Sequence, residues 1–184
     1  MTRIHWKPFE GEGKAVSLDP LTPFEDPDKQ YNSDTHLVYR KDIDTLECYW
    51  RQVDNRTRID KIMKRTTTDG IHWSKAQNVL VSDARTDRIL SPAIIYENGR
   101  YKMWTVNCKS KFPVLYRESK DGFHWTTPST IQLKYPSDRL RSWHLDVIHT
   151  EKGYEMLVVA SAKGIGTGEM NLYYTSSKNE HDFK

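Results

Sequence analysis

Two stretches, TTDGIHW (Thr67 to Trp73) and SKDGFHW (Ser119 to Trp125), carry the same Asp-Gly-apolar-His-Trp pentad 52 residues apart. Asp-Gly is typical of a turn in which the Asp side chain accepts backbone N–H groups and Gly adopts a positive φ. The Trp that follows is expected to begin the next strand and to pack its ring against the sheet. We therefore interpret the pentads as structural staples, one in each of two repeats.

The residues around the pentads divide the chain into three similar units. Their first strands read SDTHLVY (33–39), SPAIIYENGRYKMW (91–104) and LDVIHTEKGYEMLV (145–158), each with a turn to a second aromatic strand. A third strand and a polar turn follow in every unit. Repeats of about 50 residues with four short antiparallel strands are typical of β-propellers. The sequence therefore predicts an all-β fold of propeller blades, at about 30–80, 88–135 and 143–184.

Three blades do not close a ring, because propellers close with about four to eight. We expect residues 1–184 to form a single partial propeller domain, with 1–29 as a lead-in segment or the tail of a preceding blade. Such a piece leaves two sheet faces open, which predicts self-association through them.

Composition and motifs exclude several classes of function. The net charge of +3 is spread along the chain, so no nucleic-acid partner is predicted. No apolar run resembles a signal peptide or a membrane span, which predicts a cytosolic protein unless export uses a route that the chain does not encode. The seven histidines show no metal-ligand spacing, and no cofactor is expected. Cys48 and Cys108 could be paired or free.

The three first strands, with the Asp-Gly-x-x-Trp pentads of the first two units, resemble the five-bladed propellers of glycoside hydrolase family 43 and its fructan-hydrolysing and mannoside-processing relatives. The resemblance implies a carbohydrate ligand and hydrolysis by carboxylates at the inner ends of first strands. It assigns Asp34 as the general base and Asp146 as the Asp that orients the sugar. These two residues flank Ser91 at spacings of 57 and 55 residues.

The chain departs from the family pattern in three places. Thr35 and Val147 stand where the family has proline, and the acidic Glu of the family belongs to the blade after the third. Alignment of the second and third units on Gly99 and Gly153 places Asp146 opposite Pro92, one residue out of step with Asp34 opposite Ser91. A shift of one residue turns a side chain to the other face of a strand.

The stretch RSWHLDV supplies further candidates for substrate binding, Arg141, Trp143 and His144. Sugar sites combine aromatic rings with carboxylates and ring nitrogens, so these residues could line a cavity floor. Trp143 could equally be a packing residue, and Asp34 could merely cap a turn.

Two functions therefore remain open on the sequence. One is a glycoside hydrolase in which Asp34 and Asp146 act with an acid supplied from further along the propeller. The other is a non-catalytic carbohydrate-binding or assembly module, such as those of phage tails and cell-surface complexes. Propellers carry many unrelated functions, so the fold alone does not decide between the two.

Overall fold

The protein is all-β in the computed structural model, which describes residues 5–6, 16–17, 22, 28–108, 111–163 and 169–184. Most of the predicted lead-in segment, residues 1–29, lies outside these ranges. Within them, no helix is long and apolar enough to cross a membrane.

Three antiparallel sheets follow one another along the chain. The first sheet contains β3 (Gln30–Arg40), β4 (Thr45–Asp54), β5 (Ile59–Thr67) and β6 (Gln77–Asp83). The second contains β7 (Ile89–Glu97), β8 (Arg100–Asn107), β9 (Val114–Ser119) and β10 (Ser129–Thr130). The third contains β12 (Arg141–Thr150), β13 (Gly153–Ser161) and β14 (Asn171–Ser177). Two short pairs complete the fold, β1 (His5–Trp6) with β2 (Val16–Ser17) and β11 (Gln132–Leu133) with β15 (Asp182–Phe183).

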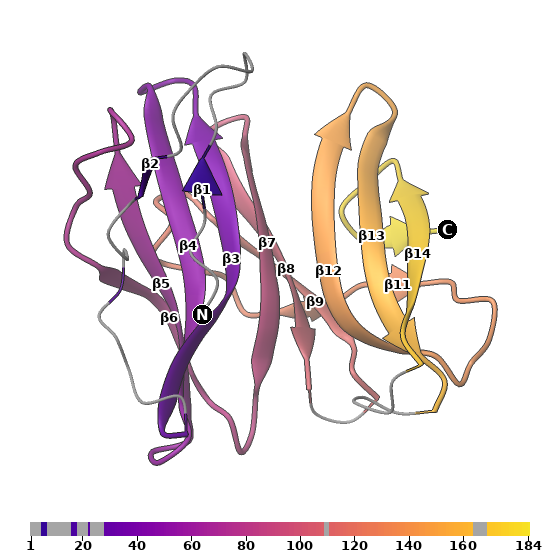
Figure 1. The fold of residues 1–184 in the computed structure, drawn as a ribbon. Helices are drawn as coiled ribbons and strands as arrows, with labels where there is room; N and C mark the ends of the chain where they lie inside the picture. The colour runs from indigo at the N-terminus through magenta and orange to yellow at the C-terminus, as the bar shows by residue number, and fades with distance from the viewer. Residues whose placement is uncertain (1–4, 7–15, 18–21, 23–27, 109–110, 164–168) are drawn as a thin grey trace.

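The sheets stack face to face, with the second between the first and the third (Figure 1). The first strand of each sheet lies innermost, since β3 contacts β7 and β7 contacts β12. We call the face that each sheet turns toward the next sheet its front face, and the opposite face its rear face. This is the stacking of propeller blades, as the repeats predicted.

Two apolar clusters hold the stack together. Between the first and second sheets, Tyr49 and Ile62 pack against Ile94 and Met103. Between the second and third sheets, the cluster centres on Trp104, which is fully buried. The core therefore lies between the sheets, and each sheet depends on its neighbour for burial of its apolar face.

The pentads form the turns that the sequence predicts. Oδ1 of Asp121 accepts the backbone N–H groups of Phe123 and His124, both at 2.8 Å, and Asp69 does the same in the first sheet. Gly122 has a φ of 76°. The expectation that the Trp begins the fourth strand is wrong, because β10 begins only at Ser129 and Trp125 makes a single bridge to Ser119.

A third, altered pentad closes the third sheet. Oδ1 of Asn179 accepts the N–H groups of His181 and Asp182 at 2.8 and 2.9 Å, as Asp121 does in the second sheet. Phe183 takes the place of the Trp and is buried in the cluster between the second and third sheets. The repeat therefore survives in geometry where its sequence has changed.

The hairpins differ in a way that corrects the alignment on glycines. The turn from β7 to β8 uses Asn98 and Gly99, both with positive φ, and Glu97 pairs with Arg100. In the third sheet Gly153 is instead the first residue of β13 and pairs with Thr150. The two glycines are not equivalent, and matching them displaces the third sheet by one residue.

Cross-strand pairing gives the true register. Asp146 pairs with Leu157 at the same number of pairs from its hairpin as Ala93 pairs with Trp104. Asp146 therefore corresponds to Ala93, and the prediction that it aligns with Pro92 is wrong. Counted from the hairpins in the same way, Asp34 and Ser91 correspond to His144.

Candidate functional site

A cavity of about 250 Å³ lies where the first strands of the three sheets meet. Each strand contributes a short run of its residues. The lining residues are Asp34, Thr35, His36, Ser91, Pro92, His144, Leu145 and Asp146. Both predicted catalytic carboxylates and one predicted substrate-binding residue are therefore brought together in one place.

Bulges in the first two sheets shape this cavity. Pairing between β3 and β4 is interrupted between Ser33 and His36, and pairing between β7 and β8 between Leu90 and Ala93. Asp34, with a φ of 55°, lies inside the first bulge. Ser91 lies inside the second, with a φ of 49°. Bulges redirect side chains and often occur beside functional sites, and here they direct equivalent residues to one point.

Asp34 is fixed by contacts on both of its oxygens. Its Oδ2 lies 2.9 Å from Nε of Arg51 and accepts the backbone N–H of Ser91 at 3.3 Å. Its Oδ1 lies 3.6 Å from Nδ1 of His144. The Asp34 and Arg51 side chains are only 9% and 6% exposed, so water screens this ion pair little. Asp34 thus does more than cap a turn.

Arg51 on β4 is one of the site residues that sequence reasoning missed. It donates to Oγ of Ser33 and to the carbonyl of Ile89, and its NH1 lies 3.9 Å from Oδ2 of Asp60. Burial raises the pKa of Asp60, against the opposing effect of the neighbouring guanidinium groups. The sequence did carry a signal for Arg51, because it is a charged residue inside the apolar strand LECYWRQV. A charged side chain in such a place is buried only when it has a partner.

His144 connects the second and third sheets across the cavity. Its Nδ1 makes a 2.5 Å hydrogen bond with Oγ of Ser91 and also faces Asp34. Both contacts use the same ring nitrogen, so these residues do not form a catalytic triad, in which serine and aspartate contact different nitrogens. Burial lowers the pKa of His144 below its ordinary value, although Asp34 acts in the opposite direction. The neutral ring is therefore favoured in the folded state.

His36 and Asp146 form a second imidazole–carboxylate pair in the lining of the cavity. Nε2 of His36 donates to the carbonyl of Ile94 at 2.8 Å, because a carbonyl oxygen only accepts. Its Nδ1 then faces Oδ1 of Asp146 at 3.6 Å. Asp146 is the most accessible carboxylate of the cavity, with 62% of its side chain exposed. It is the group best placed to meet a ligand from solvent.

Trp143 and Arg141 lie apart from this cavity. The Trp143 ring makes edge contacts with Phe112 and with the His144 ring, at centroid distances of 6.5 and 5.2 Å. Trp143 thus packs behind His144 and is absent from the lining. A role for either residue in substrate binding stays a prediction.

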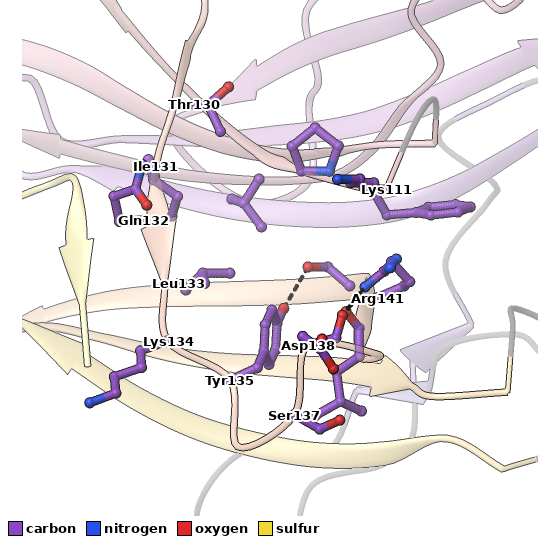
Figure 2. A pocket seen from close by; sticks show the side chains of 15 residues that line it. Lys111, Thr130, Ile131, Gln132, Leu133, Lys134, Tyr135, Ser137, Asp138 and Arg141 are labelled. Carbon is purple, nitrogen blue, oxygen red and sulfur yellow. Dashed lines mark hydrogen bonds between the residues drawn. The ribbon is translucent and has the colours of Figure 1, made fainter.

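Arg141 lines a second cavity of about 480 Å³, between the β9–β11 segment and the start of β12 (Figure 2). Its NH1 donates to the carbonyls of Asp138 and Leu140 at 2.6 and 2.8 Å. Beside it, the Tyr135 hydroxyl is hydrogen-bonded to Oγ of Ser142 at 2.6 Å, as Figure 2 shows. The guanidinium is therefore engaged with its own loop.

Other candidate chemistry is limited in the described ranges. No three His, Cys, Asp or Glu side chains lie close enough there to hold a metal ion. Cys48 and Cys108 are both free, and burial raises the pKa of each to about 11. Neither thiol is thereby suited to act as a nucleophile near neutral pH.

Comparisons with known proteins give similarity of structure only. No protein-family model matches the chain, and no curated protein sequence matches it. An N-acetylgalactosamine deacetylase from F. plautii, solved with blood group B trisaccharide, has a TM-score of 0.75 and 21% identity. The match covers 85% of this chain and 52% of that one.

Two further solved structures are arabinose-processing enzymes. The α-L-arabinanase of Penicillium chrysogenum has a TM-score of 0.59 and 15% identity, over 75% of this chain and 42% of its own. The GH93 α-L-arabinofuranosidase of Fusarium graminearum has a TM-score of 0.59 and 13% identity, over 94% and 50%. This chain spans about half the length of these structures. At such identities the likeness shows a shared propeller fold, and no match singles out glycoside hydrolase family 43.

Proposed function

We propose that this chain belongs to a carbohydrate-active propeller and binds a saccharide in the cavity between its three first strands. The observation that carries the proposal is the convergence of Asp34 and Asp146, from the first and third sheets, on that cavity. The enzymes and complexes named above act on or bind saccharides, which supports the same class of ligand.

The reaction that suits two such carboxylates is hydrolysis of a glycosidic bond. One carboxylate takes a proton from the attacking water, and a carboxylic acid protonates the leaving oxygen. Asp34 suits the role of base, since Arg51 and the Ser91 amide fix its Oδ2 and leave Oδ1 beside His144. Asp146 is accessible and suits hydrogen bonds to sugar hydroxyls. Among the described residues no third carboxylate lines the cavity, so the acid would come from a further part of the propeller.

A second candidate is hydrolysis of an N-acetyl group on a sugar. Two imidazole–carboxylate pairs line the cavity, His144 with Asp34 and His36 with Asp146. Such pairs can take a proton from water and return it to a leaving amine. The deacetylase from F. plautii, at a TM-score of 0.75, makes this reaction worth testing beside glycoside hydrolysis.

Binding and turnover are best measured on the same panel of saccharides. The panel contains arabino-oligosaccharides, fructo-oligosaccharides and oligosaccharides that end in N-acetylgalactosamine. Calorimetry gives binding, and assays for reducing ends and for free acetate report the two reactions. Asp146→Asn is the test variant, because its exposed side chain can be changed without emptying the core, and Asp138→Asn at the other cavity is the matched control.

We expect Asp146→Asn to weaken binding of the preferred saccharide at least tenfold, since a good charged hydrogen bond is worth about 1.5–3 kcal/mol. Asp138→Asn should bind as the unaltered chain does. Binding without either product would favour the non-catalytic module, and acetate without reducing ends would favour deacetylation. Equal affinity in Asp146→Asn and the unaltered chain would refute the assignment of the cavity.

A further inference from the structure

The second cavity, which we call the Arg141 cavity, has no part in the proposed function. It lies between the β9–β11 segment and the start of β12, and no described residue lines both this cavity and the one between the first strands, which we call the first-strand cavity. Its volume of about 480 Å³ is within the range of about 300–1,000 Å³ that is typical of small-molecule sites. Two of its lining residues, Ile131 and Leu140, are apolar and only 4% and 7% exposed. The cavity therefore offers a ligand apolar surface as well as polar groups.

Arg141 is held in this cavity with part of its guanidinium unused. Its NH1 donates to the carbonyls of Asp138 and Leu140 at 2.6 and 2.8 Å. A guanidinium also donates from Nε and NH2, and neither of these atoms has an acceptor among the described residues. Neither is fully buried. Together Nε and NH2 form a planar fork that matches the two oxygens of a carboxylate. Because NH1 already fixes the guanidinium, little side-chain freedom is lost when a ligand binds.

The charge of the lining favours an acidic ligand. Lys111, Lys134 and Arg141 line the cavity, and Asp138 is the one acidic residue among its described lining. Neither lysine makes an ion pair with a described residue. In Figure 2, Lys134 points away from the cavity, whereas Lys111 lies at the same end as Arg141. Arg141 and Lys111 are thus the two cations placed to meet an anion. Excess charge of one sign in a cavity concentrates ligands of the opposite sign.

Aromatic side chains line this cavity and connect it to the first-strand cavity. Phe112 of the lining makes an edge contact with Trp143, and Trp143 makes another with the ring of His144, which lines the first-strand cavity. Tyr135 adds a second aromatic ring to the lining, and its hydroxyl is held by Oγ of Ser142 at 2.6 Å. Rings with a few placed polar groups are typical of small-molecule sites. A sugar ring that carries an acidic group fits both features of the cavity.

The backbone that carries Lys111 and Phe112 has an unfavourable conformation. Their φ angles are 66° and 53°, although neither residue is glycine. Positive φ at two successive non-glycine residues is uncommon, and such strain is frequent at ligand sites. Here it accompanies the placement of both residues in the lining of the cavity.

We propose that the Arg141 cavity binds the carboxylate of a uronic acid residue in a saccharide. Nε and NH2 of Arg141 donate to the two carboxylate oxygens, and the Lys111 ammonium lies on the same anion. The inference rests on the proposed function in one respect, that the ligand of this chain is a saccharide. It does not require that the first-strand cavity is catalytic.

The test is calorimetry on the 184-residue chain with trigalacturonate and with galactotriose of the same linkage, its neutral counterpart. Trigalacturonate should bind, and galactotriose should bind about tenfold more weakly or less, because it lacks the acceptor of the charged hydrogen bonds. An increase of salt from about 20 to 200 mM should weaken the binding of trigalacturonate, since it screens the two cations.

Three variants test the residues. Arg141→Lys keeps the charge but removes the fork, and should weaken binding of trigalacturonate about tenfold or more. Lys111→Gln leaves Arg141 and its loop intact and should also weaken it. Arg139→Lys is the matched control, because Arg139 is exposed in the same loop and does not line the cavity, and it should bind as the unaltered chain does. Circular dichroism checks that the variants fold.

Four results would overturn the proposal. Equal affinity for galactotriose would show that no carboxylate is recognised. Unchanged binding in both Arg141→Lys and Lys111→Gln would exclude this cavity. Displacement of trigalacturonate by an equal concentration of sodium sulfate would show a site for any anion. Weaker binding of trigalacturonate in Asp146→Asn would place it in the first-strand cavity.

The same variants separate this proposal from the proposed function. Arg141→Lys should bind the neutral saccharide of the earlier panel as the unaltered chain does, because that ligand is assigned to the first-strand cavity. Failure of the proposed function would leave trigalacturonate bound and dependent on Arg141. Failure of the present proposal would leave the effect of Asp146→Asn on the neutral saccharide unchanged.

Discussion

Arg51→Met removes the guanidinium that we expect to hold Asp34 in place. The side chains are 6% and 9% exposed, and Nε lies 2.9 Å from Oδ2. Loss of one partner leaves the other charge buried, which costs about 3–5 kcal/mol in comparable pairs. For a chain of this size each kcal/mol lowers the melting temperature by about 2–4 °C, so a loss of roughly 6–20 °C is expected.

Urea unfolding at pH 7, followed by tryptophan fluorescence, measures the free energy of unfolding of this variant. Arg56→Met is the matched control, because Arg56 is 59% exposed and its Nε lies 3.6 Å from Oδ1 of Asp54. An exposed pair of this kind contributes at most about 1 kcal/mol. Arg51→Lys keeps the charge but loses the second N–H group, and should fall between the two. A loss in Arg51→Met no larger than that in Arg56→Met would refute the role given to the buried pair.

Three further predictions concern pH, backbone strain and a buried hydroxyl. Burial lowers the pKa of His144 below its unfolded value of about 6.5, so the unfolded chain binds the proton first as pH falls. The stability contributed by the neutral ring is present above about pH 6.5 and lost below it. The His144→Asn variant should therefore lose less stability than the unaltered chain when the pH is lowered from 8 to 5. An equal loss in both proteins would contradict this. Gly153→Ala should lower the melting temperature far more than Gly99→Ala does. A Cβ at Gly153 overlaps a backbone carbonyl at the end of β14, whereas a Cβ at Gly99 meets nothing within 4 Å. Similar losses in the two variants would count against the hairpin geometry. Tyr101→Phe should cost about 1–3 kcal/mol in urea unfolding, because buried Oε1 of Glu47 loses the 2.9 Å hydrogen bond from Tyr101 and keeps only the longer contact of 3.4 Å with Lys64. No loss would mean that this bond is not formed.

The fold was predictable from sequence where the cause of the structure is local. The pentads are confirmed as turns because Asp121 needs only N–H groups two and three residues away. The strands are confirmed most simply where burial alternates along the chain, as it does on β13 for the apolar residues Tyr154, Met156 and Val158. The turn at Asn179 was predicted only as a polar turn and not as a third pentad, because asparagine makes the same bonds under a different sequence.

The site was less predictable, because its geometry depends on distant contacts. The alignment on glycines placed Asp146 one residue out of step with Asp34, but the hairpin of the third sheet ends differently, so the offset is two residues and His144 occupies the position of Asp34. Arg51 is 17 residues from Asp34 and on another strand, so no local pattern joins them. His36 was not predicted at all, since its partner Asp146 lies on another sheet.

The central claim is that a saccharide binds between the first strands of the three sheets. The most direct measurement is ¹⁵N NMR of the seven histidine side chains during titration with the tightest-binding oligosaccharide of the panel. His36 and His144 line the cavity, so their ring signals should shift and saturate together with binding. The exposed pentad histidines, His72 and His124, should not move. Saturable binding that leaves both cavity histidines unchanged would contradict the account.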